Sequence, residues 1–166
     1  MTTEHQGQRG QQWLTTLLGL AGLPSDVQVT DSPNFAGESC CLTIADQAYQ
    51  PEQTQALIGH DGEVLDAIQY LANTTLNLGV DHDSQGAFTI ELAGYRARRY
   101  VELQELAQAA VEQVRQTGEE YEMTSLSSAE RRQLHTLLKA SEDLETFSRG
   151  QEPHRHLVVR LKQDLV

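Results

Sequence analysis

Two glycines three residues apart, Gly59 and Gly62, constrain the fold most, because they lie between two helical patterns and open the second of them. The apolar residues that follow recur at helical spacing and predict one buried stripe: Leu65, Ile68, Leu71 and Ala72. Around the glycines we expect a helix at 11–22, strands at 27–30 and 39–45, a short helix at 51–57 and a strand at 87–92. The predicted order is therefore helix, strand, strand, helix, helix, strand.

The rest of the chain carries a second set of patterns. We expect a long helix at 96–117, a strand at 121–124, a helix at 128–140 and strands at 143–147 and 156–161. Ser127 followed by Glu130 is a capping box, which predicts that the helix at 128–140 starts there. The predicted fold class is α/β (α+β), because 166 residues are too few for a barrel enzyme or two large domains. We expect a disordered tail at 1–9, one domain at 10–94 and a second, of order α-β-α-β-β, at 95–166.

The net charge of −12 is distributed unevenly along the chain. Residues 1–95 contain twelve acids and one base, Arg9, which gives −11. Residues 96–166 contain twelve acids and eleven bases, which gives −1. A polyanionic partner should therefore prefer the second half.

Several functional classes find no support in the sequence. The longest apolar run is too short to span a bilayer, and the first residues show no secretory signal pattern, so a cytoplasmic protein is expected. The adjacent Cys40 and Cys41 form no metal or redox motif, and His154 and His156 have no further ligand to complete a metal set. Because a nucleophile elbow and a P-loop are both missing, we expect no catalytic activity and no cofactor.

The segment Gly59-His60-Asp61-Gly62 is the first candidate site. Its glycines would let a nucleic-acid backbone approach closely, and the helix that follows offers free N–H groups to a phosphate. The alternative is a plain glycine turn in which Asp61 helps to cap the helix. Asp61 also places an anion where a phosphate would lie, which costs about 1 kcal/mol at ~4 Å in water. This groove is therefore expected to bind nucleic acid weakly.

The helix at 128–140 is the second candidate. Arg131 and His135 are four residues apart and share a face, which Arg132 and Lys139 extend into a basic stripe. Arg131 is expected to border the buried face and still reach solvent, where its fork suits a phosphate. Arg155, at the start of the last strand, is predicted to join Arg131 and His135 in one anion site. The alternative is a solvated basic helix face with His135 packed against the core.

A third cluster lies at the start of the long helix. Arg96 and Arg99 stand there with tyrosines, a combination that could stack on and contact RNA. Equally, these arginines could pair with local acids while the tyrosines pack.

The segment LIGHDGEVLDAIQYLANTTLNL resembles the KH-domain core of the bacterial Jag family. SAERRQLH at 128–135 and TFSRGQEPHR at 146–155 resemble the signature of that family's RxxxH domain, named for an arginine and a histidine with three residues between them. The resemblance covers about 10–166 and implies a KH domain followed by an RxxxH domain, in a short form without the separate N-terminal Jag domain. It implies a bacterial, non-catalytic protein that binds single-stranded RNA, with a role in post-transcriptional regulation.

The charge split places the main RNA contacts of such a protein in the RxxxH domain. The resemblance also suggests two protein partners, a second small KH protein and, through peripheral association, membrane-insertase machinery. The alternative function is a protein-interaction adaptor. Its acidic KH half would dock a partner protein in a cell-envelope or membrane-insertase context.

Overall fold

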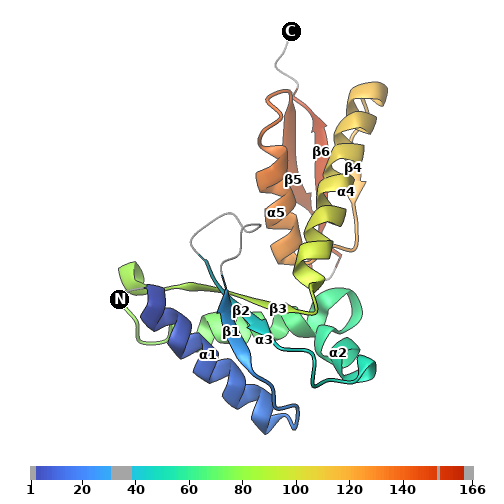
Figure 1. Ribbon diagram of the computed structural model, residues 1–166. Helices are drawn as coiled ribbons and strands as arrows, with labels where there is room; N and C mark the ends of the chain where they lie inside the picture. Colours follow the sequence, from blue (N-terminus) through green and yellow to red (C-terminus); the bar gives the residue numbers. More distant parts are fainter. Residues whose placement is uncertain (1–2, 31–38, 153, 163–166) are drawn as a thin grey trace. The chain divides into compact units, whose positions relative to one another are not determined.

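The computed structural model describes residues 3–30, 39–152 and 154–162 and divides the chain into two compact units, Met1–Arg98 and Arg99–Val166 (Figure 1). Each unit contains one three-stranded sheet and its own hydrophobic core. The mixed α/β class expected from the sequence is therefore confirmed.

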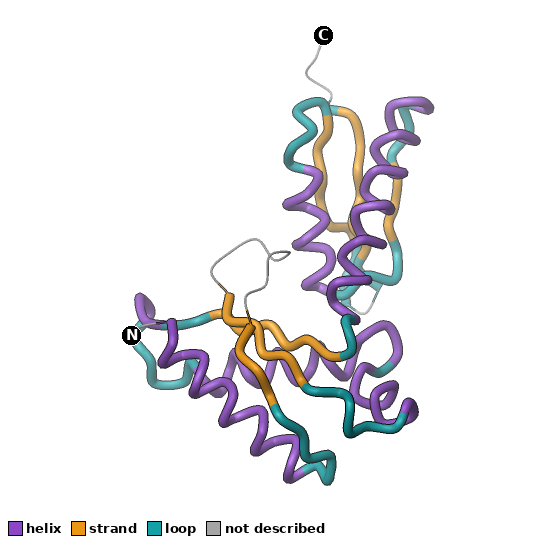
Figure 2. Tube along the Cα trace, in the orientation of Figure 1, coloured by secondary structure: helices purple, strands orange, loops and turns teal. Residues whose placement is uncertain are grey.

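In chain order the elements of the first unit are α1 (Thr3–Leu20), β1 (Val27–Thr30), β2 (Ser39–Ile44), α2 (Pro51–Ile58), the 3-10 helix η1 (His60–Gly62), α3 (Glu63–Leu76), the 3-10 helix η2 (His82–Ser84) and β3 (Ala87–Leu92). The unit packs α1 and α3 against its sheet, and α2 lies beside α3 (Figure 2). The strand order is β1-β2-β3, with β1 antiparallel and β3 parallel to β2. Fully buried Leu14, Leu65 and Leu42 place the core between the helices and the sheet.

The expected disorder of residues 1–9 is wrong for residues 3–9, which are helical; residues 1 and 2 lie outside the described part of the chain. This polar segment is held in place by contacts with residues far away in the sequence. The Gln6 amide donates to the Ser84 carbonyl (3.0 Å) and Arg9 to the Leu76 carbonyl (2.9 Å). Gly10 fits against the sheet, since a Cβ there would lie 2.8 Å from the Phe88 ring.

Amide side chains of α3 close the outer edge of β3. The Asn73 amide donates to the Phe88 carbonyl and accepts from the Phe88 N–H, both at 2.8 Å. Asn77 makes the same pair of bonds to Gly86, and Gln69 accepts from the Ile90 N–H. Four residues of helix rise about 6 Å and two residues of strand about 6.6 Å, so the two spacings match. The side chains replace a fourth strand and block pairing at this edge.

Replacing Asn73 with alanine should lower the free energy of unfolding of the first unit by about 2 kcal/mol, because one backbone donor and one acceptor lose their partners. Urea denaturation followed by circular dichroism measures this change. Thr74→Ala is the control, because that exposed hydroxyl bonds only to the Tyr70 carbonyl of its own helix. Equal stability of the two variants would show that the Asn73 amide does not hold β3.

The second unit places two helices on one face of an antiparallel sheet. The elements are α4 (Tyr95–Thr117), whose first residues belong to the first unit, β4 (Tyr121–Met123), α5 (Ser128–Leu138), β5 (Leu144–Arg149) and β6 (His156–Leu161), with strand order β4-β6-β5. The capping box is confirmed: Ser127 Oγ accepts from the Glu130 N–H, and the Glu130 carboxylate accepts from the Ser127 N–H. The core includes Leu103, Leu134 and Leu157.

Candidate nucleic-acid interface

A pocket of about 360 Å³ lies beside α5 and β5 in the second unit. Its lining residues come from α5, from β5, from the turn that leads into β6 and from β6 itself: Ser128, Arg131, Arg132, His135, Thr146, Phe147, Ser148, Glu152, Arg155 and Leu157. The structure thus brings together Arg131, Arg132, His135 and Arg155, as the sequence predicts. Lys139, the C-cap of α5, is exposed and is not among the lining residues.

Arg131 is buried, with only 5% of its surface exposed, so the expectation that it reaches solvent is wrong. Its guanidinium donates to the main-chain carbonyls of Leu126 (2.6 Å) and Arg155 (3.2 Å) and forms an ion pair with Glu152. These acceptors satisfy a group that would otherwise be costly to bury. Arg131 therefore connects α5 to the β5–β6 hairpin, and it has a structural role in the wall of the pocket.

His135 is half-buried, and its Nδ1 lies 2.5 Å from the Thr146 hydroxyl. This hydrogen bond orients the imidazole ring. It leaves Nε2 as the ring nitrogen that can meet a ligand in the pocket.

Three bases that have no carboxylate partner in the described part of the chain lie on α5, at its C-cap or at the pocket. Arg132, Arg155 and Lys139 are exposed, and within the described ranges none of them has an ion pair or a side-chain hydrogen bond. Five other arginines of the second half have a carboxylate partner: Arg96 with Asp66, Arg99 with Glu130, Arg115 with Asp143, Arg149 with Glu120 and Arg160 with Glu145. Arg98 and Lys162 donate instead to the main-chain carbonyls of Ala93 and Glu142. Hydrogen bonds from Arg115 and Arg149 hold the pKa of Asp143 and of Glu120, respectively, below the usual range. Those acids thus remain charged and keep their arginines neutralised.

Arg96 and Arg99 are paired with nearby acidic side chains, which is the alternative to an RNA contact that the sequence left open. Arg96 Nη1 lies 2.5 Å from Asp66 Oδ1, and the Arg96 Nε donates to the Ile90 carbonyl. Arg99 Nε lies 2.6 Å from Glu130 Oε1, a hydrogen bond that raises the pKa of the guanidinium. Neither arginine lines the pocket.

The Gly59–Gly62 loop is built around its glycines. Both have positive φ, 78° and 83°, and a Cβ on Gly62 would lie 2.5 Å from the Tyr95 hydroxyl. The side chains of His60 and Asp61 are exposed at the tip, with His60 Nδ1 3.3 Å from Asp61 Oδ2. The conformation of the turn itself thus requires the two glycines. The Asp61 carboxylate lies next to His60 at the tip of the loop.

Thr146, Ser148 and Glu152 line the pocket, although no pattern in the sequence points to a role for them. Glu152 reaches Arg131 because Gly150, with φ 88°, turns the hairpin sharply; a Cβ there would lie 2.6 Å from the His154 carbonyl oxygen. A glycine just after a strand pattern was the signal for this turn, but nothing in the spacing pairs Glu152 with Arg131.

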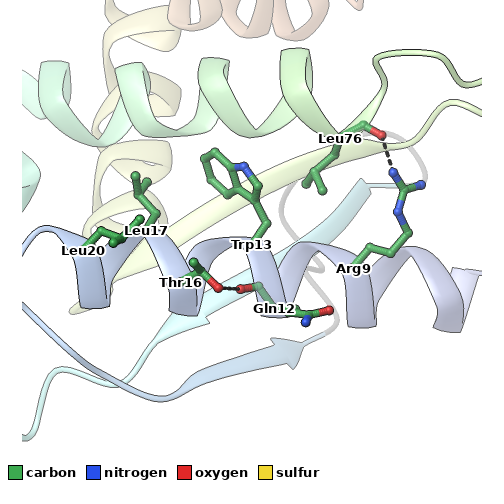
Figure 3. A pocket seen from close by; sticks show the side chains of 7 residues that line it. All are labelled: Arg9, Gln12, Trp13, Thr16, Leu17, Leu20 and Leu76. Atoms are coloured by element: carbon green, nitrogen blue, oxygen red, sulfur yellow. Dashed lines mark hydrogen bonds between the residues drawn. The ribbon is translucent and has the colours of Figure 1, made fainter.

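A second pocket, of about 400 Å³, lies in the first unit along α1 (Figure 3). Trp13, Leu17 and Leu20 line it with Leu76 of α3, and Arg9 donates to the Leu76 carbonyl at its rim. Trp13 packs against the core, while Leu20 is 84% exposed.

The described residues place no group of three or more histidine, cysteine, aspartate or glutamate side chains where it could hold a metal ion. Over the same residues, none of the helices combines the length and the apolar character needed to cross a membrane.

The fold and the pocket define a two-unit α/β protein whose second unit is an RxxxH domain, since the family model of that domain matches residues 101–161. The chain is 30% identical over 163 residues to the RNA-binding protein KhpB of Bacillus subtilis, covering 94% of this chain and 71% of that protein. It therefore belongs to the KhpB family, which is the Jag family that the sequence resembles.

Other KhpB proteins are similar over shorter stretches. The RNA-binding protein KhpB of Clostridium symbiosum is 33% identical over 110 residues, and that of Lactiplantibacillus plantarum is 32% identical over 108 residues. These alignments include 65% and 64% of this chain. The chain spans 48% and 33% of the length of these two relatives.

Proposed function

We propose that this protein binds single-stranded RNA without catalysis, and that the main contacts are made by Arg132, His135 and Arg155 at the pocket of the second unit, with Lys139 beside it. The observation that carries this proposal is that Arg132 and Arg155 line one pocket without an acidic partner among the described residues, whereas five other arginines of the same half are paired with carboxylates. The relatives named RNA-binding protein KhpB support RNA as the polyanion. Glu152, the one carboxylate lining the pocket, is bound to Arg131, which favours binding over catalysis.

Flexible single strands suit this pocket better than a duplex. A major-groove reader needs a helix whose exposed face carries several base-contacting side chains, whereas this pocket lies between a helix and a strand. Single-stranded RNA can splay its bases and phosphates into such a pocket. We further propose that the protein binds RNA in the cytoplasm and acts in post-transcriptional regulation.

The first unit has the features of a KH domain, namely the order helix, strand, strand, helix, helix, strand and a Gly-x-x-Gly turn before α3. We propose that the first unit forms a KH domain and that the second unit corresponds to the RxxxH domain, close to the bounds 10–94 and 95–166 expected from the sequence. The acidic charge of residues 1–95 and the exposed Asp61 make the KH turn a minor contributor to RNA affinity.

Fluorescence anisotropy of the full chain with a labelled single-stranded RNA tests the proposal. Affinity should exceed that for duplex DNA of the same sequence. It should fall roughly tenfold between about 50 and 200 mM salt, because two or three neutralised phosphates give a logarithmic slope near −2. Equal affinity for both nucleic acids, or no salt dependence, would contradict the proposal.

The adaptor alternative has one observation in its favour, the pocket along α1 with its half-buried Trp13 and exposed Leu20. In that case the first unit would dock a partner protein, such as a second small KH protein or a component of membrane-insertase machinery. A complex that survives ribonuclease treatment and is lost in Leu20→Asp would favour the adaptor function.

A further inference from the structure

The outer edge of β5 differs from that of β3, because its backbone groups remain open. β5 is an edge strand in the order β4-β6-β5, and its register pairs Leu144 with Leu161 through Arg149 with His156. The Lys162 N–H donates to the Asp143 carbonyl, so Asp143 and Lys162 form one more pair of the register. This hydrogen bond shows which residues of β5 bond to β6 and which alternate with them. In an antiparallel ladder, alternate residues direct both backbone groups away from the partner strand. In β5 these residues include Thr146 and Ser148.

These open groups lie at the pocket. Thr146 and Ser148 are among its lining residues, together with Arg132, His135 and Arg155. In the described part of the chain, no backbone group of Thr146 or Ser148 has a hydrogen-bond partner beyond the sheet. A row of backbone donors and acceptors thus stands beside the unpaired cations.

An extended residue directs its N–H and its C=O to the same side, so it presents one donor and one acceptor next to each other. Nucleobases likewise carry neighbouring donors and acceptors on their Watson–Crick edges, and proteins read single-stranded RNA by bonding to these edges. We propose that the free edge of β5 reads the base of a bound nucleotide. The main chain of Thr146 and Ser148 bonds to the base edge while Arg132 and Arg155 hold neighbouring phosphates. This inference rests on the proposed RNA binding and adds base selectivity to it.

The charges favour RNA over a β-strand from another protein. The main chain of a peptide strand would satisfy the backbone groups of β5, but it carries no charge for Arg132 or Arg155, whereas the RNA backbone carries a phosphate at each linkage. A nucleotide supplies a hydrogen-bonding edge and a phosphate on one flexible unit, which meets both requirements.

Two substitutions at one residue separate the backbone donor from the side chain. Ser148→Pro removes the outward N–H, and it costs no bond to β6 because proline is tolerated where an edge strand faces solvent. Ser148→Ala removes the hydroxyl and keeps the N–H. Affinities of the full chain are measured for hexa-adenylate, hexacytidylate, hexauridylate and an abasic hexamer, with thermal melting of each variant.

The wild type should bind its preferred hexamer about tenfold more tightly than the abasic one, since the base contributes one or two hydrogen bonds. Ser148→Pro should bind all four oligomers within about twofold of one another while keeping the salt dependence, and Ser148→Ala should keep the preference. Wild-type binding that is salt-dependent but equal for all four oligomers would overturn base reading alone. Failure to bind any of them would overturn RNA binding itself.

Amide NMR of the wild type provides a measurement that does not depend on the folding of Ser148→Pro. The amide protons of Thr146 and Ser148 should shift downfield with the preferred hexamer and stay in place with the abasic hexamer. Unshifted amides would overturn the proposal. So would RNA-free self-association that Ser148→Pro abolishes, because the edge would then pair with another protein strand.

Discussion

Replacing Arg131 with alanine should lower the free energy of unfolding of the second unit by about 3 kcal/mol. The substitution leaves the Leu126 and Arg155 carbonyls without their side-chain donor and opens a cavity where the guanidinium was buried. Each buried polar group without a partner costs about 1–3 kcal/mol. For a unit of this size the melting temperature should fall by roughly 10–20 °C. Differential scanning calorimetry of the full chain measures it.

The neighbouring Arg132→Ala is the matched control, because Arg132 belongs to the same helix and is exposed. Its stability should stay within about 0.5 kcal/mol of the parent. If Arg131→Ala melts at the parent's temperature, the buried guanidinium does not hold the hairpin to α5.

The double variant Arg132→Ala/Arg155→Ala should bind single-stranded RNA about a hundredfold more weakly than the parent while melting like it. Each exposed arginine is expected to make one charge-assisted contact to phosphate, worth at least about 1.5 kcal/mol, or roughly tenfold in affinity. Because both side chains lack partners within the described residues, their loss leaves no buried group unsatisfied. Fluorescence anisotropy and thermal melting measure the two properties on the same samples.

Arg115→Ala/Arg149→Ala removes the same formal charge from arginines already paired with Asp143 and Glu120. This double variant should lose no more than about threefold in affinity, because neither arginine lines the pocket and carboxylates already neutralise both. Similar losses in both double variants would mean that net charge, and no particular pocket, governs RNA binding.

Local patterns predicted many of the helices and strands. The strands at 27–30, 87–92 and 156–161 have the predicted bounds, because alternating side chains and flanking turn residues mark both ends of each. The first turns of α1 were not predictable from composition. Gln6 and Arg9 are polar, and the carbonyls that order them belong to Ser84 and Leu76, far away in the sequence.

The candidate site was predictable only in its charged residues. Helical spacing and the position of Arg155 indicated one anion site, and the structure places these side chains around one pocket. The burial of Arg131 was missed because a helical projection treats arginine as a solvent-facing residue, whereas its acceptors at Leu126, Glu152 and Arg155 meet only in the folded chain. The role of Thr146 and Ser148 depends on β5 being an edge strand, and strand order is not visible in local sequence patterns.

The amide side chains of α3 that cover β3 also restrict how this family member can change in length. Gln69, Asn73 and Asn77 reach β3 because they are spaced by four residues. One inserted or deleted residue between them would rotate every later side chain by about 100° around the helix axis and shift it by about 1.5 Å. The backbone of β3 would then lose its bonds to the displaced amides at once. The segment 69–77 should therefore accept substitutions on its exposed side but neither insertions nor deletions.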